Sequence, residues 1–441
     1  MVKYEPVIGL EVHVELNTRS KMFCRCSADY FGKEPNSHTC PTCLGLPGAL
    51  PYINEEAINK CIQIGLALKC QVSKKSLFER KNYFYPDLSK GYQISQYRWP
   101  LCVSGWLDVE DDSGQVIKIR INRAHQEEDT GKLTHKGNET LIDFNRSGVP
   151  LVEIVTEPDF TNSSQVRDYA KKLQQIFRYL GVSNADMEKG QMRLEANISV
   201  REVGQKDLPP YRVELKNINS FRFMVAAVEY EINRQIEAHE KGEKLIQETR
   251  GWDENKKQTY VQRSKEEAHD YRYFPEPDLP EMEVDESMVE NLRSKIPELP
   301  AEKRKRYEKE WGLKLADAKV LIDSRELAVF FESAVAHGKK HDVSAQDVAK
   351  YIVNKKLNIT EILPTQVIEE IKGKKVGVIE DEEELEKLGQ QAIEQNPKAV
   401  EDFKKGKETA LQSLFGEVMR LSKGKADISK LKPILEKLLR Q

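Results

Sequence analysis

Four segments of the chain alternate apolar and polar residues, which is the pattern of β-strands with one buried face. They are residues 7–16, 150–158, 192–201 and 212–216. In the first segment, the polar positions are Glu11, His13 and Glu15. Because successive side chains of a strand point to opposite faces, these three side chains are expected to share the face opposite to the apolar ones.

The polar faces of these strands carry groups that water-facing strands seldom combine. The later segments contribute Glu153, Glu157, Arg193, Glu195, Asn197, Arg201, Arg212, Glu214 and Lys216. A half-buried strand with its polar side in water explains each segment taken alone. Carboxylates, cations, a histidine and an amide on one face favour instead a shared cleft that binds Mg²⁺ and polyphosphate.

Segments with an apolar residue every 3.6 positions predict amphipathic helices between these strands. One helix is expected to start near Ser164 and to end before Gly181, a residue that suits a left-handed C-cap. Another is expected to follow Asn54, a favourable N-cap. The mixture of short strands and helices up to about residue 290 indicates an α+β domain.

Prolines between Tyr273 and Pro280 prevent a regular element from running through this segment, so we expect the first domain to end soon after it. Beyond it the chain becomes helical, with short helices expected between residues 295 and 375. Residues 380–384 form a charge run, which is read as a solvated helix start or a linker. We therefore predict domains over residues 1–292, 293–375 and 376–441.

The charge of the chain limits how it can bind nucleic acid. A formal net charge of −3 excludes binding by bulk positive charge, so any RNA contact must come from a local patch. From residue 401 onward, Lys and Arg outnumber Asp and Glu by ten to six, which makes the tail mildly basic. No stretch reaches the roughly 18 apolar residues that span a bilayer, and Lys3 and Glu5 interrupt a signal peptide. A cytoplasmic location is the default expectation.

Four of the seven cysteines lie within 20 residues of one another, as Cys24, Cys26, Cys40 and Cys43. The 13 residues between the two pairs include turn-forming residues, which suits a loop that folds back to close a tetrahedral site. We predict a structural Zn²⁺ in loop 24–43, with free reduced thiols as the alternative. Four thiolates would leave no open position for chemistry, and His38 is interpreted as a bystander.

Two further segments carry candidate chemistry. Residues 80–96 are rich in aromatic and amide groups, with Lys81 and Tyr83 among them, and could stack a base while a lysine neutralises phosphate. A packed aromatic loop explains the same pattern equally well. Residues 125–132 group several acids, which are expected to be solvated. The chain has no Walker A motif, so the residues alone indicate a nucleotide only weakly.

Long motifs follow one another in order across nearly the whole chain. They are VIGLEVHVEL, CPTCLGLPGALP, RKNYFYPDL, GYQISQ, HQEEDTGK, THKG, GVPLVEIVTEPD, EANISVR, ELKNINSF, SKEEAHDYRYFPEPDLP and NPKAVEDFKKGKE. Together they resemble the B subunits of the glutamyl/aspartyl-tRNA amidotransferase family. The resemblance implies an α+β catalytic cradle on a mainly antiparallel sheet, followed by an all-α helical domain and a small helical tail.

The resemblance also implies a reaction in two steps. ATP phosphorylates the side-chain carboxylate of glutamate on tRNA(Gln) or aspartate on tRNA(Asn), and ammonia then displaces the phosphate to give the amide. Ammonia would come from an amidase A subunit, and a small C subunit would complete a heterotrimer. ATP, Mg²⁺ and a misacylated tRNA are therefore expected to bind, and no membrane is involved.

The family's site residues are carried over position by position. Catalytic and Mg²⁺ positions fall on Glu11, His13, Glu128 and Glu153, and Lys90 with Glu128 matches the polar pair where ammonia enters. Candidates for contacts to ATP or substrate are Lys81, Tyr83, Arg146, Arg193, Asn197 and Lys216. The basic tail is expected to contact the body of the tRNA.

The chain departs from the family pattern in a few places. Glu195 stands where the family often has Asp, Ser89 replaces a common Pro, and the region between about 355 and 380 looks shortened. An archaeal-type relative of this protein is one alternative, but the chain has no room for its extra inserted domain. A non-catalytic, zinc-stabilised RNA-binding protein is another, but it should show a basic cleft, whereas the expected face is acidic.

Overall fold

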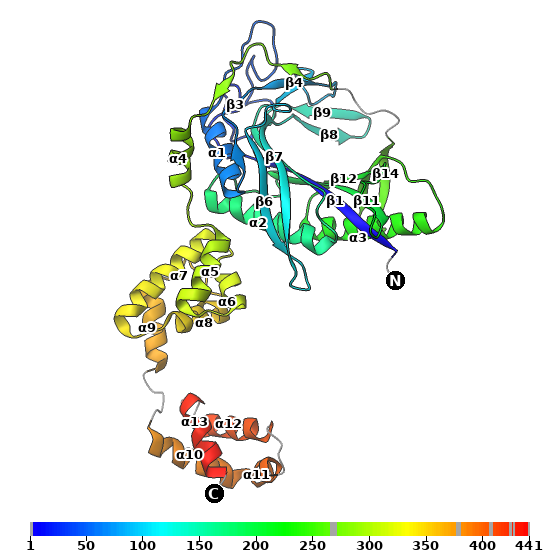
Figure 1. Cartoon of the computed structure of the whole chain (residues 1–441). Helices are drawn as coiled ribbons and strands as arrows, with labels where there is room; N and C mark the ends of the chain where they lie inside the picture. The colour runs from blue at the N-terminus through cyan, green and yellow to red at the C-terminus, as the bar shows by residue number, and fades with distance from the viewer. Residues whose placement is uncertain are drawn as a thin grey trace. The chain divides into compact units, whose positions relative to one another are not determined.

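A computed structural model describes residues 3–264, 271–375, 381–404, 409–422, 426 and 428–439 (Figure 1). Contacts between residues divide the chain into two compact units, residues 1–303 and 304–441. The three domains expected from the sequence stay a prediction, and the residues just after their second boundary, 376–380, lie outside the described part of the chain. The motif SKEEAHDYRYFPEPDLP lies outside it over residues 265–270.

The first unit is built on a nine-stranded sheet in the order β14-β13-β12-β11-β1-β10-β7-β6-β2. The strands are β1 (Tyr4–Glu15), β2 (Gln71–Val72), β6 (Cys102–Glu110), β7 (Val116–Glu128), β10 (Pro150–Thr156), β11 (Met192–Glu202), β12 (Val213–Ile218), β13 (Glu248–Asp253) and β14 (Gln258–Ser264). Their pairing is antiparallel except between β12 and β13. The predicted α+β class is therefore confirmed.

Strand β1 lies in the middle of this sheet, and its apolar face is completely buried. Leu10, Val12 and Val14 are each at most 1% exposed. Burying a side chain of this size stabilises the fold by about 1.5–3 kcal/mol. The core below them is shared with three helices, α1 (Glu55–Ala67), α2 (Ser163–Leu180) and α3 (Phe221–Glu240) (Figure 1). The opposite face of β1 is left for the polar residues.

The predicted ends of helices α1 and α2 are confirmed. The side chain of Asn54 accepts hydrogen bonds from the backbone N–H groups of Glu56 and Ala57. Gly181 ends α2 in the left-handed region at φ 68°, where a side chain would be strained.

Smaller sheets complete the first unit. They are β15-β4-β5, β16-β3 and β8-β9, formed by β3 (Lys75–Ser76), β4 (Glu79–Asn82), β5 (Tyr92–Ser95), β8 (Lys132–Lys136), β9 (Glu139–Asp143), β15 (Phe274–Pro275) and β16 (Met282–Glu283). β15 is a short strand in the proline segment where no regular element was expected to run, and it ends at its proline. The segment is held in place because Arg80 donates two hydrogen bonds, of 2.6 and 2.8 Å, to Glu276.

The described part of the second unit is helical. Its elements are α5 (Pro300–Trp311), which starts in the first unit, α6 (Leu315–Leu321), α7 (Arg325–Gly338), η1 (Lys339–His341), α8 (Ala345–Lys355), α9 (Pro364–Lys375), α10 (Glu382–Gln395), α11 (Pro397–Lys404), α12 (Thr409–Leu421) and α13 (Ile428–Leu439). Asp381 caps α10, so the charge run is a helix start. Among the helices that the structure describes, none combines the length and the apolar character that crossing a membrane requires.

Candidate active-site cleft

A row of polar side chains crosses the centre of the large sheet. His125 on β7 lies opposite Glu153 on β10, Glu153 lies opposite His13 on β1, and His13 lies opposite Arg193 on β11. Each is flanked along its strand by residues that face the core, so the alternation of the strands turns the whole row to the other face. The polar residues of these strands therefore share one face of the sheet, and the shared cleft stays a prediction.

His13, Glu127 and Glu153 form the first cluster of possible metal ligands, with all their ligand atoms within 4.8 Å of one another. His13 Nε2 lies 3.8 Å from a Glu127 oxygen and 3.7 Å from a Glu153 oxygen. His125 contacts both carboxylates as well, at 3.4 and 3.3 Å. Burial acts to lower the pKa of His125, but the negative charge of Glu153 and hydrogen bonds to both carboxylates raise it to about 9.

Glu11, Glu195 and Glu214 form a second cluster, again within 4.8 Å. Burial raises the pKa of Glu11, and repulsion by Glu153 and Glu195 raises it further. Lys216 contacts Glu195 at 2.9 Å and Glu214 at 3.3 Å. One lysine does not balance three carboxylates that repel one another, so the cluster suits a hard cation.

The second cluster also has an unused acceptor beside it. Asn197 donates a 2.9 Å hydrogen bond from Nδ2 to Glu11. Its Oδ1 is buried and has no partner among the described residues. Buried polar atoms are usually satisfied, so this oxygen is placed to bind a cation or one of its waters.

An aromatic wall with Lys81 at its centre borders the first cluster. The Lys81 ammonium lies 5.0 Å from the centre of the Tyr271 ring and 5.9 Å from that of Tyr83. Burial acts to lower the pKa of Lys81, but attraction by Glu127 and other neighbours raises it overall, so the ammonium stays charged. Tyr273 stacks on Tyr97 at 4.5 Å.

The acids of residues 125–132 are buried, so the expectation that they are solvated was wrong. Glu127, Glu128 and Asp129 are each at most 3% exposed. Each of the three is paired with a polar side chain. Glu127 accepts a hydrogen bond from Ser95 at 2.6 Å, Asp129 accepts one from Arg193 at 2.8 Å, and Glu128 is paired with Lys90. Buried carboxylates are tolerated when they are paired in this way.

The guanidinium of Arg146 is hydrogen-bonded to the backbone that follows β7. It donates hydrogen bonds of 3.0 and 2.8 Å to the carbonyls of Thr130 and Gly131, and it lies 3.6 Å from Asp129. These contacts occupy its guanidinium. Its expected contact to phosphate stays a prediction.

The structure does not bring the four residues expected at the Mg²⁺ site together, and Glu128 does not join His13 and Glu153. It follows Glu127 on β7 and therefore points to the other side of the strand. There Lys90 Nζ lies 2.5 and 2.6 Å from its two oxygens, and the backbone N–H of Ile94 donates to it at 2.9 Å. The Lys90–Glu128 pair lines a cavity of about 180 Å³.

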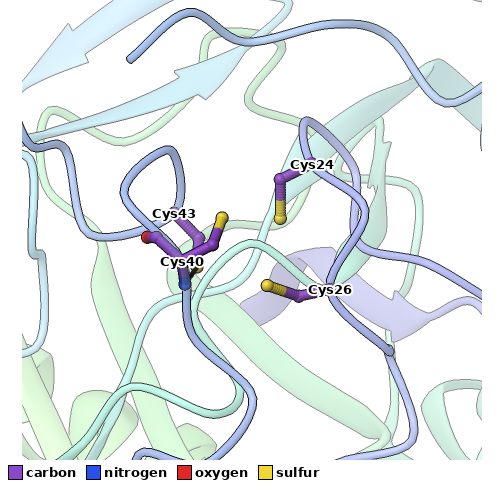
Figure 2. Close-up of side chains that lie close together, drawn as sticks. All are labelled: Cys24, Cys26, Cys40 and Cys43. Atoms are coloured by element: carbon purple, nitrogen blue, oxygen red, sulfur yellow. Dashed lines mark hydrogen bonds between the residues drawn. The ribbon is translucent and has the colours of Figure 1, made fainter. Parts of the chain in front are cut away.

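The four cysteines come together as predicted, with their sulfur atoms within 4.8 Å of one another and their side chains directed to a common centre (Figure 2). None forms a disulfide. A hydrogen bond from Cys24 lowers the pKa of Cys43 to about 5 against the effect of burial, with help from Lys21. This cysteine cluster could hold a metal ion, and His38 is not part of it among the described residues.

Comparison with known proteins places the chain in a family. The GatB/GatE catalytic domain matches residues 6–290, and the GatB domain matches residues 319–439. The B subunit of the aspartyl/glutamyl-tRNA(Asn/Gln) amidotransferase of Thermotoga petrophila is 45% identical over 99% of both chains. Those of Carboxydothermus hydrogenoformans and Caldicellulosiruptor saccharolyticus are 46% and 45% identical, over 97% and 99% of both chains. The chain belongs to this B-subunit family.

Membership of the B-subunit family decides between the interpretations left open by the sequence. The named relatives favour it over the archaeal-type relative and over a non-catalytic RNA-binding protein. The alignment with the Thermotoga petrophila protein is 486 positions long, more than the 441 residues here, so part of that relative has no counterpart in this chain. The location of this shortening between 355 and 380 stays a prediction.

Sequence reasoning missed three kinds of residue in the cleft. Glu127 and His125 were expected only as members of an acid-rich segment, and Tyr271 and Tyr273 only as part of a motif. The uninterrupted polar run His125–Asp129 hides which side chains share a face, so no alternation pointed to Glu127. Tyr271 contacts Lys81 although almost 200 residues separate them, and Tyr273 packs against Tyr271, so no local pattern in the sequence predicts these contacts.

Proposed function

We propose that the protein is the transamidating B subunit of a tRNA-dependent amidotransferase and converts Glu-tRNA(Gln), Asp-tRNA(Asn) or both to the amidated forms. The observation that carries this proposal is the pair of acidic clusters on the polar face of the sheet, in a chain of the B-subunit family. Glu11 belongs to the second cluster but is repelled by Glu153 of the first, so the two clusters are close enough to interact. Two such clusters can bind cations that neutralise phosphate groups.

His13, Glu127 and Glu153 would hold one Mg²⁺, and Glu11, Glu195 and Glu214 a second cation. Such ions stabilise the negative charge of ATP and of the acyl phosphate. The unpartnered Asn197 oxygen beside Glu11 supports this fit. Glu195 takes the place where the family often has Asp and still reaches the second cluster.

The side chains around the clusters would bind and orient the substrates. Lys81 and Lys216 place positive charges beside the two clusters, where phosphate oxygens can be bound. Tyr83 lies against Lys81 and provides an aromatic face for a base. Asp129 holds the guanidinium of Arg193 next to His13, so the positive charge of Arg193 is fixed at the edge of the row.

Ammonia would enter on the other side of strand β7. The Lys90–Glu128 pair lines a cavity there, and Glu128 is the chain neighbour of Glu127 in the cleft. A carboxylate in such a cavity can bind ammonium and accept a proton from it, which leaves ammonia as the nucleophile. Ammonia then attacks the acyl carbon, phosphate leaves with the electron pair of the broken C–O bond, and the nitrogen loses one proton to the departing phosphate to give the amide.

The remaining features suit a member of a larger complex. We propose that the cysteine cluster binds a structural Zn²⁺, since four thiolates close a tetrahedral shell. We further propose that an amidase A subunit supplies ammonia, that a small C subunit forms the third chain of the heterotrimer, and that the mildly basic tail contacts the tRNA.

The test is amidation by the assembled complex. The chain, its A and C partners, ATP, Mg²⁺, glutamine and either Glu-tRNA(Gln) or Asp-tRNA(Asn) are mixed, and the amino acid recovered from the tRNA is identified. We expect Gln or Asn with the wild type and none with Glu11→Gln. Glu157→Gln is the matched control, because Glu157 lies beyond β10 and accepts a hydrogen bond from Asn122 outside both clusters.

Two outcomes of this experiment would contradict the proposal. If neither tRNA is amidated although the complex forms and hydrolyses glutamine, the transferase proposal fails. If Glu157→Gln is as inactive as Glu11→Gln, the activity does not depend on the two clusters as proposed.

A further inference from the structure

Residues 22–45, which contain the four cysteines and are called the cysteine loop below, lie directly against the Lys90–Glu128 pair. The hydroxyl of Ser89 donates a 2.7 Å hydrogen bond to the carbonyl of Cys43. Cys24, Cys43 and the pair line the same cavity. A loop expected only to stabilise the fold is therefore also one wall of the site where ammonia would enter.

Gly45 makes the contact between the loop and Lys90 unusually close. A Cβ atom at this position would lie 2.6 Å from Lys90 Cγ and 3.1 Å from Lys90 Cα. Gly45 also has a φ of +67°, which favours glycine. The loop thus packs its backbone against both the backbone and the side chain of Lys90.

Glu128, the other member of the pair, is reached through Gly148. A Cβ atom on Gly148 would lie 3.6 Å from Cys43 Cβ and 3.8 Å from a Glu128 oxygen. The Met22 N–H donates a 2.7 Å hydrogen bond to the Gly148 carbonyl, which joins the start of the cysteine loop to this segment. Both members of the pair are therefore positioned against the same loop.

The segment that carries Lys90 connects β4 to β5 and is anchored at two points of its turn. At Asp87, the side chain accepts a 2.9 Å hydrogen bond from the Thr130 hydroxyl, and the carbonyl accepts one of 2.8 Å from the Gly131 N–H. The second anchor is the Ser89 hydroxyl, whose acceptor belongs to the cysteine loop. Ser89 directly precedes Lys90 in the chain, so the hydrogen bond of its hydroxyl is the nearer of the two anchors to Lys90.

We infer that the cysteine loop sets the position of Lys90 opposite Glu128, and that Ser89 is the positioning residue that transmits it. This inference rests on the proposed role of the pair in ammonia entry. With Ser89 unable to donate, Lys90 loses its nearest anchor and can leave its place over Glu128, so the site binds ammonium more weakly. The chemistry in the cleft on the other side of β7 is unchanged.

The experiment measures amidation by the full complex with ammonium in place of glutamine. For Ser89→Ala we expect the KM for ammonium to rise by about three- to tenfold, the range that one lost hydrogen bond supports. The kcat at saturating ammonium should stay at the wild-type value. Ser89→Thr keeps the hydroxyl and should restore the KM, and the exposed Ser113→Ala on the β6–β7 turn should not change it.

A merely structural role for Ser89 would give a different result. It would lower the zinc content or the thermal stability of the protein and would reduce kcat and active fraction together. A wild-type KM in Ser89→Ala, with the wild-type complex active, overturns the inference while the proposed function stands. An inactive wild-type complex overturns the proposed function instead.

A second measurement does not depend on activity. In a crystal structure of Ser89→Ala, we expect the Lys90 ammonium to have moved away from Glu128. Retention of the 2.5 and 2.6 Å contacts of the wild type would overturn the inference.

Discussion

Substitution of Lys21 tests whether its positive charge stabilises a metal ion bound by the four cysteines. Its side chain is fully buried, a rare state for lysine. Its ammonium donates hydrogen bonds to the carbonyls of His38 at 2.7 Å and Phe144 at 3.3 Å, and it lies 3.7 Å from the sulfur of Cys43. A divalent metal bound by four thiolates carries two net negative charges, so a cation at this distance should favour the metal-bound form.

The size of the effect follows from the distance. At 3.7 Å, one pair of unit charges attracts by roughly 4–5 kcal/mol when the effective dielectric constant is about 20. Part of this attraction is already present in the metal-free protein, where the hydrogen bond from Cys24 and the charge of Lys21 lower the pKa of the Cys43 thiol, so we expect a net loss of about 2–3 kcal/mol in metal binding when the charge is removed. Lys21→Met, which keeps an unbranched apolar chain, should therefore weaken zinc binding by roughly 30- to 150-fold.

Competition with a chromophoric zinc chelator measures the change in Kd. Lys33→Met is the matched control, because Lys33 lies in the same loop but is half exposed and pairs only with Asp29 at 3.4 Å among the described residues. Its Kd should stay within about twofold of the wild type, as expected for an exposed pair. Urea unfolding of the metal-free proteins separates the charge effect from the two carbonyls that Lys21→Met leaves unpaired. Wild-type zinc affinity in a folded Lys21→Met protein would refute the reasoning.

Three further predictions concern the cleft and the fold. Burial, with the charge of Asp129 adding to it, raises the pKa of Glu15 from 4.5 to about 8, so the stability this group contributes is full below pH 4.5 and is lost as the pH rises to about 8. Glu15→Gln should remove that part of the pH dependence in urea unfolding, and an unchanged slope between pH 5 and 8 would contradict it. Glu127→Gln should lower amidation by about 100-fold or more, while glutamine hydrolysis by the complex is retained; near-normal amidation would exclude Glu127 from the site. Asn54→Ala removes the cap of α1 and should cost about 1 kcal/mol in the free energy of unfolding, measured with urea, and an unchanged free energy would show that the cap does not stabilise the helix.

Local patterns in the sequence predicted the parts of this structure that local physics determines. The alternation around Glu11 and His13 gave the central strand and its polar face, and Asn54 and Gly181 marked helix ends through the conformations they favour. The paired cysteine spacing predicted a cluster. Each of these signals needs only residues that are close together in the chain.

Long-range features could not be read in the same way. Which strands flank β1 depends on packing across the whole sheet, so the row from His125 to Arg193 was not visible. The choice between Glu127 and Glu128 depends on the phase of β7, and a shift of one residue exchanges the faces. At the second cluster the register between β11 and β12 shifts beside Glu195, where Asn217 adopts a φ of 59°. The burial of Lys21 could not be predicted either, because lysine counts as a polar residue in a hydrophobic pattern.

The central place of β1 has a consequence for how the protein is made. Strand β1 pairs with β10 on one side and β11 on the other, and the contact between Glu5 and Arg201 joins residues 196 positions apart. Its two edges therefore lack their partner strands until the chain has been synthesised as far as β10 and β11. During that interval β1 is an unpaired strand with a hydrophobic side, the kind of segment that chaperones bind and that aggregates when it is left exposed. Substitutions that slow the arrival of β10 and β11 should consequently reduce the yield of folded protein even where they leave the finished cleft intact.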